Sequence, residues 1–245
     1  MLILGIETAT AQAGCALGTA EGVLVSISLS RPRRHVEMLV PAIDFACRQA
    51  GVTLAGVTGI AVDIGPGLFS GLRVGVATAK ALAQALRVPT VAVCSLDLLA
   101  FEVRHSGRLI VAAIDARRGE VYCAFYRQVP GGVQRLSPYQ MLTPADLATE
   151  LLARGEDCLL VGDGALRYAD TLGQWATFEL GGSSNSFPSA RVLVELARPR
   201  MAAEDFVAAV ALEPMYLRRS DAEINWDAAI NWKGSGIARA PGGPS

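Results

Sequence analysis

Gly-Pro-Gly-Leu-Phe-Ser-Gly-Leu-Arg-Val-Gly, residues 65–75, is the stretch that decides the fold of this 245-residue chain. It follows a β-branched run that ends at Asp63, and a segment that is typical of a helix, 72–86, comes after it. A strand that enters a glycine-rich turn and then a helix leaves backbone N–H groups unpaired, and these suit a phosphate or another anion. The alternative is that the glycines serve only the turn and close packing. The local pattern favours neither interpretation.

The predicted elements around this turn occur twice along the chain. In the first half we expect strands, helices and strands in the order 2–7, 14–19, 23–29, 35–50 (helix), 58–63, 71–86 (helix) and 90–94. In the second half we expect strands at 109–115, 120–127, 132–136 and 158–161, and helices after Thr143-Pro144, near 165–172 and at 188–198. Thr143 suits a helix N-cap and Pro144 the first helical position. The pattern predicts a duplicated α/β architecture with a cleft between two lobes.

Composition excludes several classes of protein. The net charge of −1 provides no basic field for a stand-alone nucleic-acid-binding protein. The five cysteines are widely spaced, without a C-x-x-C metal motif, which is typical of buried thiols in a reducing compartment. The N-terminus does not resemble a signal peptide, and the apolar runs are shorter than the ~20 residues that a membrane span needs. We expect a cytoplasmic protein with no membrane partner.

The expected helix at 35–50 is apolar around more than half of its circumference. A helix that packs on one sheet needs only a stripe about 100° wide. The second apolar face, with Met38 and Phe45 as candidates, therefore predicts an interface with another chain, and burial in a core is the alternative. Pro41 should bend this helix or mark its true start.

Five stretches together resemble the bacterial TsaB family, which has the actin/Hsp70-type duplicated fold. They are I-L-G-I-E-T-A-T (3–10), R-R-H-V-E-M-L-V-P-A-I-D (33–44), G-P-G-L-F-S-G-L-R-V-G-V-A-T-A-K-A-L-A (65–83), I-D-A-R-R-G-E-V-Y (114–122) and P-M-Y-L-R (214–218). The resemblance implies an α/β fold of two tandem βββαβα lobes of the actin/Hsp70 (ribonuclease-H-like) type, with mixed sheets flanked by helices. The expected lobes are 1–104 and 105–204. Residues 205–228 should join the first lobe, and 233–245 should form a disordered tail.

The resemblance also implies a function. TsaB proteins act in the synthesis of N6-threonylcarbamoyladenosine at position 37 of tRNA, as a noncatalytic scaffold for the paralogous transferase TsaD. The ATPase TsaE joins the larger complex, TsaB alone forms a homodimer, and tRNA is engaged indirectly. The expected interface with TsaD or a second copy comprises His35, Met38, Leu39, Ala42, Phe45, Arg73, Ala77 and Lys80.

A nucleotide or anion cleft is the second expected site, and it comprises Glu7, Thr8, Gly65, Gly67, Ser70, Gly71 and Arg117. Glu7 lies where actin-like enzymes hold an acidic residue near the metal of the nucleotide, and capping of the following turn is the alternative. Arg117 could meet an anion or form a local ion pair. No cofactor is expected to be required, although weak ATP or ADP binding is compatible with this cleft.

The resemblance also implies that this chain differs from TsaD at the metal-binding positions. TsaD proteins carry a His-x-x-x-His metal pair, and Ser95 and Leu99 occupy the corresponding positions here. A serine hydroxyl is a poor ligand and leucine offers none, so no metal site of this type is expected. The alternative function is a nucleotide-dependent phosphotransferase or ATPase on the same fold. A peptidase function has no support, since neither a zinc pair nor a catalytic nucleophile is evident.

Overall fold

The structure, a computed structural model, describes residues 1–30, 35–173 and 178–218, and of His35 and Val36 only the backbone. The expected tail at 233–245 and the joining segment beyond residue 218 lie outside these residues.

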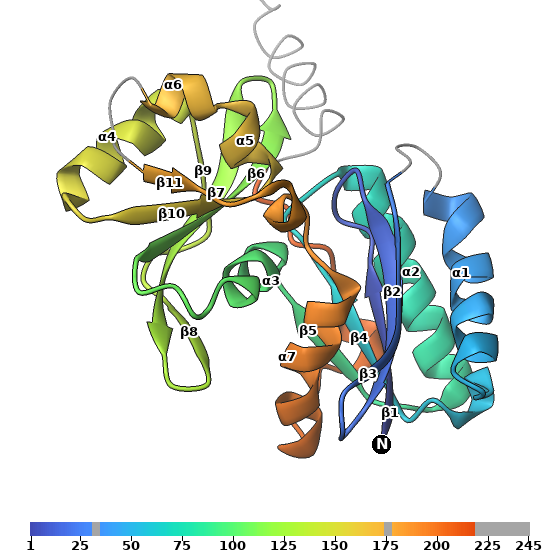
Figure 1. The fold of residues 1–245 in the computed structure, drawn as a ribbon. Coiled ribbons are helices and arrows are strands. Elements are labelled where there is room, and N and C mark those ends of the chain that lie inside the picture. Colours follow the sequence, from blue (N-terminus) through green and yellow to red (C-terminus); the bar gives the residue numbers. More distant parts are fainter. Residues whose placement is uncertain (31–34, 174–177, 219–245) are drawn as a thin grey trace, which may run out of the picture.

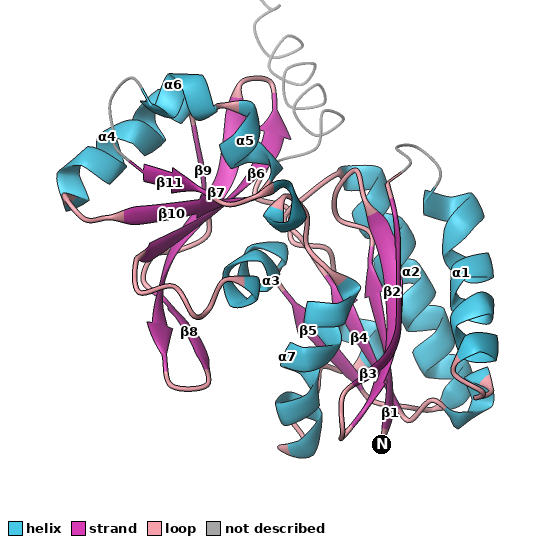
Figure 2. Cartoon of the chain, in the orientation of Figure 1, coloured by secondary structure: helices cyan, strands magenta, loops and turns pink. Residues whose placement is uncertain are grey.

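Two mixed β-sheets form the framework, and their strands follow the same order (Figures 1 and 2). The first sheet has the order β3-β2-β1-β4-β5, and the second has the order β8-β7-β6-β10-β11, with β9 paired to β7. In each half the first three strands pair antiparallel in sequence order. A parallel strand then pairs with the first one, β4 with β1 and β10 with β6, and a second parallel strand, β5 or β11, pairs with that one. The repeated order confirms the predicted duplicated α/β fold.

The elements have the following bounds. The strands are β1 (Leu2–Glu7), β2 (Ala13–Thr19), β3 (Val23–Leu29), β4 (Gly59–Asp63), β5 (Thr90–Val93), β6 (Leu109–Arg117), β7 (Glu120–Val129), β8 (Gly132–Arg135), β9 (Gln140–Leu142), β10 (Cys158–Val161) and β11 (Phe178–Leu180). The α-helices are α1 (His35–Gln49), α2 (Phe69–Leu86), α3 (Ser95–Glu102), α4 (Pro144–Arg154), α5 (Asp163–Arg167), α6 (Ala169–Gly173) and α7 (Ala190–Ala202). Short 3₁₀ turns lie at Leu54–Gly56, Ser183–Asn185 and Ala209–Ala211.

The last helix of each half packs beyond its own half. Helix α7 lies on the first sheet, on the face opposite α1 and α2 (Figure 1), where Val192 and Leu193 join a core with Ile3. Helix α3 places Leu96 and Leu99 in the core of the second sheet. Packing of their apolar faces, rather than position in the chain, thus decides which sheet these two helices cover, and each crosses the expected division of the chain at residue 104.

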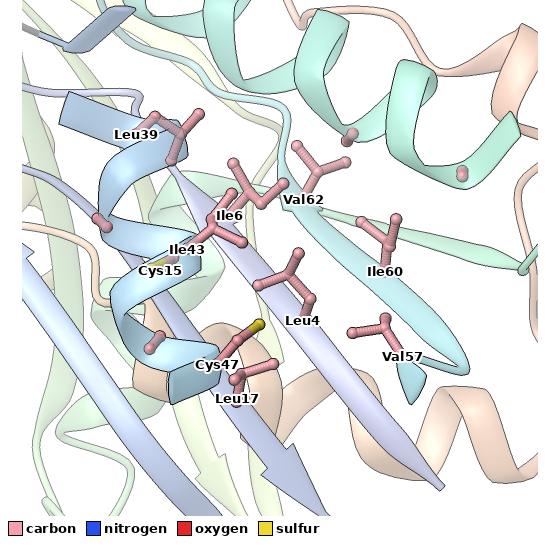
Figure 3. Close-up of a cluster of buried hydrophobic side chains, with 14 of the residues drawn as sticks. Leu4, Ile6, Cys15, Leu17, Leu39, Ile43, Cys47, Val57, Ile60 and Val62 are labelled. Carbon is pink, nitrogen blue, oxygen red and sulfur yellow. The ribbon is translucent and has the colours of Figure 1, made fainter. Parts of the chain in front are cut away.

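Helix α1 covers the first sheet with one face. Leu39, Ile43 and Cys47 pack against Leu4 and Ile6 of β1 (Figure 3). Leu39 and Ala42, which we expected at an interface, are only 3% and 7% exposed and belong to this core. This part of the interface prediction is wrong, because both residues lie on the stripe that faces the sheet.

The same helix continues through Pro41, so the proline does not mark its start. Its outer face carries two large apolar side chains, Val40 and Phe45, which are 61% and 49% exposed. Met38 is half-buried beside them. The outer face of α1 thus combines these apolar side chains with charged ones, such as Asp44 and Arg48, and no described part of the chain covers Val40 or Phe45.

The segment 205–218 crosses from the first sheet to the second. Val207 forms a bridge to Thr90, and Leu212 is buried in the core beneath α1 and α2. The Met215 N–H then donates to the carbonyl of Ile64 at 2.6 Å, and Arg218 bonds to the Ala116 carbonyl of the second sheet. This segment therefore connects both halves at the end of β4 instead of joining the first alone.

Local sequence signals predicted several features of the structure correctly. The Thr143 hydroxyl accepts the Asp146 N–H at 3.1 Å, as expected of an N-cap. The cysteines are all free and buried. The expected helix near 165–172 is instead two short helices, α5 and α6, and α3, β9 and β11 were not predicted.

Within the residues that the structure describes, no helix is both long and apolar enough to cross a membrane.

Candidate functional site

Two buried carboxylates lie side by side at one edge of the first sheet. Strands β1 and β4 are parallel neighbours with Ile6 opposite Val62, so Glu7 and Asp63 end adjacent strands. Asp63 Oδ1 accepts the Gly65 N–H at 2.8 Å and the Ser95 hydroxyl at 2.7 Å. Glu7 Oε1 accepts the Ala9 N–H at 2.7 Å. The other oxygens, Glu7 Oε2 and Asp63 Oδ2, are buried without a hydrogen-bond partner.

Burial determines the protonation of this pair. Burial raises the pKa of Glu7 well above its usual range, and the neighbouring Asp63 raises it further. Burial also raises the pKa of Asp63 to about 7, although hydrogen bonds from Ser95 and Gly65 oppose the shift. Within residues 1–30, 35–173 and 178–218, no arginine or lysine forms an ion pair with either carboxyl group. At neutral pH the pair therefore holds at least one proton.

The second sheet also has an acidic pair, Asp115 and Asp163, but here arginine side chains lie beside it and offset its negative charge. Asp163 Oδ1 accepts the Asp115 N–H at 3.0 Å, and Asp115 Oδ2 lies 3.1 Å from Arg117 Nη1 and 3.5 Å from Arg167 Nη1. These arginines are half-exposed, so each ion pair contributes at most about 1 kcal/mol. The local ion pair that we weighed for Arg117 is thus present. Arg117 belongs to the opposite sheet from the other expected cleft residues.

The glycine-rich turn packs closely against the loop that follows β1. A Cβ on Gly67 would lie 2.1 Å from the carbonyl oxygen of Ala9, which already accepts the Leu68 N–H at 2.6 Å. The Gly65 N–H is occupied by Asp63. Two donors of the turn are therefore used inside the chain, which supports the packing interpretation of the glycines.

The start of α2 is fixed by similar contacts. The Thr8 hydroxyl donates to the Gly71 carbonyl at 2.8 Å, and a Cβ on Gly75 would lie 2.3 Å from Thr8 Oγ1. Thr8 and Gly71 are buried, whereas Ser70 is exposed. The structure thus brings Glu7, Thr8 and the glycines together, mostly out of contact with solvent.

Replacing Gly67 with alanine should destabilise the protein by about 1–3 kcal/mol, because the new methyl group meets backbone atoms that cannot move away. The measurement is the free energy of unfolding in urea. Gly107→Ala is the control, since nothing lies within 4 Å of a Cβ at that position. Equal effects of the two substitutions would show that the turn tolerates side chains.

An exposed face on α1 and α2 forms the second candidate site. We define the helical face as Val40, Phe45, Phe69, Arg73 and Ala77, all of which are exposed, together with Tyr216. Lys80 and Met38 lie partly buried at its border. The side chain of His35, which we also expected here, lies outside the described residues.

One end of the helical face is an ordered cluster. The rings of Phe69 and Tyr216 lie 5.0 Å apart between centroids, and the Arg73 guanidinium carbon lies 3.8 Å from the Phe69 ring centroid. Arg73 Nε also donates to the Tyr216 hydroxyl at 3.3 Å. Phe69 is one turn before Arg73 on the helix, so sequence spacing could have found it. Tyr216 belongs to the 214–218 stretch quoted above, but nothing in that stretch indicates a contact with α2.

The positions expected to lack metal ligands have structural roles. Ser95 donates to Asp63, and Leu99 is in the core of the second sheet. Across residues 1–30, 35–173 and 178–218, no group of three or more His, Cys, Asp or Glu side chains is arranged to hold a metal ion.

Comparisons with known proteins identify relatives along nearly the whole chain. The family model described as TsaD, tRNA N6-adenosine threonylcarbamoyltransferase, matches residues 23–162. The tRNA threonylcarbamoyladenosine biosynthesis protein TsaB of Bacillus subtilis is 32% identical over 230 residues, which cover 92% of this chain and 98% of that protein. TsaB of Escherichia coli is 29% identical over 90% of this chain and 96% of that protein. The solved structure of YeaZ from Pseudomonas aeruginosa, 31% identical, superposes with a TM-score of 0.77 over 88% of this chain and 99% of that one.

Proposed function

Because this chain belongs to the TsaB family of tRNA threonylcarbamoyladenosine biosynthesis proteins, we propose that it is a noncatalytic subunit that binds and supports a TsaD-type transferase. In this proposal the helical face of α1 and α2 is the binding surface. TsaE joins the larger complex, tRNA is engaged through the transferase, and the chain forms a homodimer when no partner is present.

The apolar helical face is the observation that carries the proposal. Aromatic residues and arginine are the residue types that supply most of the binding energy at protein interfaces, and here Phe45 of α1, Phe69 and Arg73 of α2 and Tyr216 are all exposed. The Phe69–Tyr216–Arg73 contacts hold three of these side chains in place before binding, which reduces the entropy that docking costs.

The buried carboxylate pair supports a noncatalytic role. A catalytic carboxylate must be within hydrogen-bond reach of the substrate, and Glu7 and Asp63 are almost completely buried. The Gly65 and Leu68 N–H groups, which a nucleotide phosphate would need, are bonded to the chain itself. We therefore propose that the subunit requires no cofactor and binds ATP or ADP weakly.

A phosphotransferase or ATPase is the competing proposal, and the unpartnered oxygens of Glu7 and Asp63 are the observation in its favour. Both proposals are tested by assaying threonylcarbamoyl transfer to tRNA with the TsaD paralogue and TsaE, with and without this chain. We expect transfer only when TsaD and this chain are both present, and no ATP turnover by this chain alone. Tight binding of Mg²⁺-ATP with turnover by the isolated chain would favour the enzyme and contradict our proposal.

A further inference from the structure

A cavity of about 370 Å³ lies between the two halves of the molecule. Its walls come from α3 and α7 and from the β7–β8 hairpin. Small-molecule sites occupy about 300–1,000 Å³, so the volume suits a small ligand. The lining includes neither the carboxylate pair nor any residue of the helical face.

Most of the cavity wall is apolar. Phe101 of α3, Leu196 of α7, Val133 of β8 and Val93 of β5 line it. Gly132 lies beside Phe101, where a Cβ would be 3.6 Å from the ring. The wall can therefore enclose the hydrocarbon part of a ligand.

One end of the cavity carries a carboxylate held by two phenols. The Tyr126 hydroxyl donates to Asp97 Oδ1 at 2.8 Å, and the Tyr139 hydroxyl donates to Oδ2 at 2.7 Å. Burial, followed by the negative charge of Asp97, raises the pKa of Tyr126, so this phenol stays neutral and its oxygen can still accept a hydrogen bond. No lysine or arginine of the described chain forms an ion pair with Asp97. This end suits a cationic donor.

Arg135 supplies a positive charge beside the negative charge of Asp97. Its guanidinium carbon lies 3.7 Å from the centroid of the Tyr139 ring, and among the described residues no carboxylate pairs with it. Arg200, the other arginine of the lining, is already bonded to Asp205 at 2.6 Å and to the Ala92 carbonyl at 2.6 Å. Arg135 is therefore the cation that remains available to an acidic group.

We infer that this cavity binds a small zwitterion with an apolar body, of the α-amino acid class. Its ammonium group meets Asp97 and the phenol oxygens, its carboxylate meets Arg135, and its side chain lies among Phe101, Val133 and Leu196. A ligand with a single charge satisfies only one of these two charged groups. Asp97 on α3 and Arg135 on β8 both lie on elements that pack with the second sheet, and Leu196 of α7 adds the wall from the first sheet.

The test uses L-leucine as the probe, titrated into the full chain without a partner and followed by calorimetry. Two analogues each lack one charge: 4-methylpentanoate has only the carboxylate, and 3-methylbutylamine has only the amine. Since charged hydrogen bonds are the strong ones, we expect each analogue to bind at least about tenfold more weakly than leucine. An absence of leucine binding at millimolar concentration, or equal binding of either analogue, would overturn the inference.

A matched pair of variants locates the bound carboxylate. Arg135→Gln should weaken leucine binding by about tenfold while leaving the binding of 3-methylbutylamine unchanged. Arg127→Gln is the control, since Arg127 is a half-exposed arginine of the same hairpin that pairs with Glu156 and does not line the cavity. An equal loss in both variants, or no loss in Arg135→Gln, would contradict the assignment.

Discussion

Replacing Phe45 with aspartate is expected to abolish binding of the TsaD paralogue and to leave the fold intact. Phe45 is half-exposed on the outer face of α1, so its removal costs the isolated chain little. An unpaired carboxylate buried in an interface costs several kcal/mol, which corresponds to a loss of affinity of at least about 100-fold. The measurement is the dissociation constant for the partner, with circular dichroism to verify folding. Arg73→Ala on the same face should have a smaller effect.

Leu152→Asp is the matched control for this substitution. Leu152 is a similarly exposed leucine on α4, which belongs to the second sheet. The Leu152→Asp variant should bind the partner with the same dissociation constant as the unsubstituted chain. If Phe45→Asp unfolds the protein, then Phe45 is a core residue and the interface assignment is wrong; if both variants bind normally, the interface lies elsewhere.

The second large effect concerns the buried carboxylate pair and is a dependence of stability on pH. The folded-state pKa values of Glu7 and Asp63 are raised above those of the unfolded chain. The protonated pair therefore contributes stability that is fully present below the unfolded pKa values, about 4, and is lost as pH rises through the raised folded-state pKa values, which are about 7 for Asp63 and well above the usual range for Glu7.

Glu7→Gln should remove part of this loss. The amide keeps an acceptor for the Ala9 N–H but cannot ionise, so we expect the variant to be more stable than the unsubstituted chain at pH 8, by about 1–3 kcal/mol. The gain should disappear at pH 4. Urea unfolding at both pH values measures it, and Asp44→Asn, at an exposed aspartate paired with Arg48, is the control. A gain that is the same at both pH values would show that folding does not raise the pKa of Glu7.

The fold was predictable from the sequence because its signals are local. The β-branched runs, the glycine-rich turn and the Thr143 cap each specify one element, and their repetition indicates the duplicated order of strands. The positions of α3 and α7 were not predictable in this way. Their apolar faces are visible in the sequence, but the sheet that each face covers depends on tertiary packing.

The candidate sites were predicted less completely for the same reason. The apolar surplus of α1 indicated a second face, yet spacing alone did not separate exposed Phe45 from buried Leu39. Glu7 was singled out, whereas its partner Asp63 became evident only from the register of β1 and β4. The sequence did not decide whether the glycines of the 65–75 turn bind an anion or serve close packing. The close approach of Gly67 to the Ala9 carbonyl, which the sequence does not show, favours packing.

Native mass spectrometry of this chain with and without the TsaD paralogue tests the central claim most directly. The account predicts a one-to-one complex at micromolar concentrations that forms at the expense of any homodimer. Masses of the two separate proteins alone, at the same concentrations and with both chains folded, would contradict it.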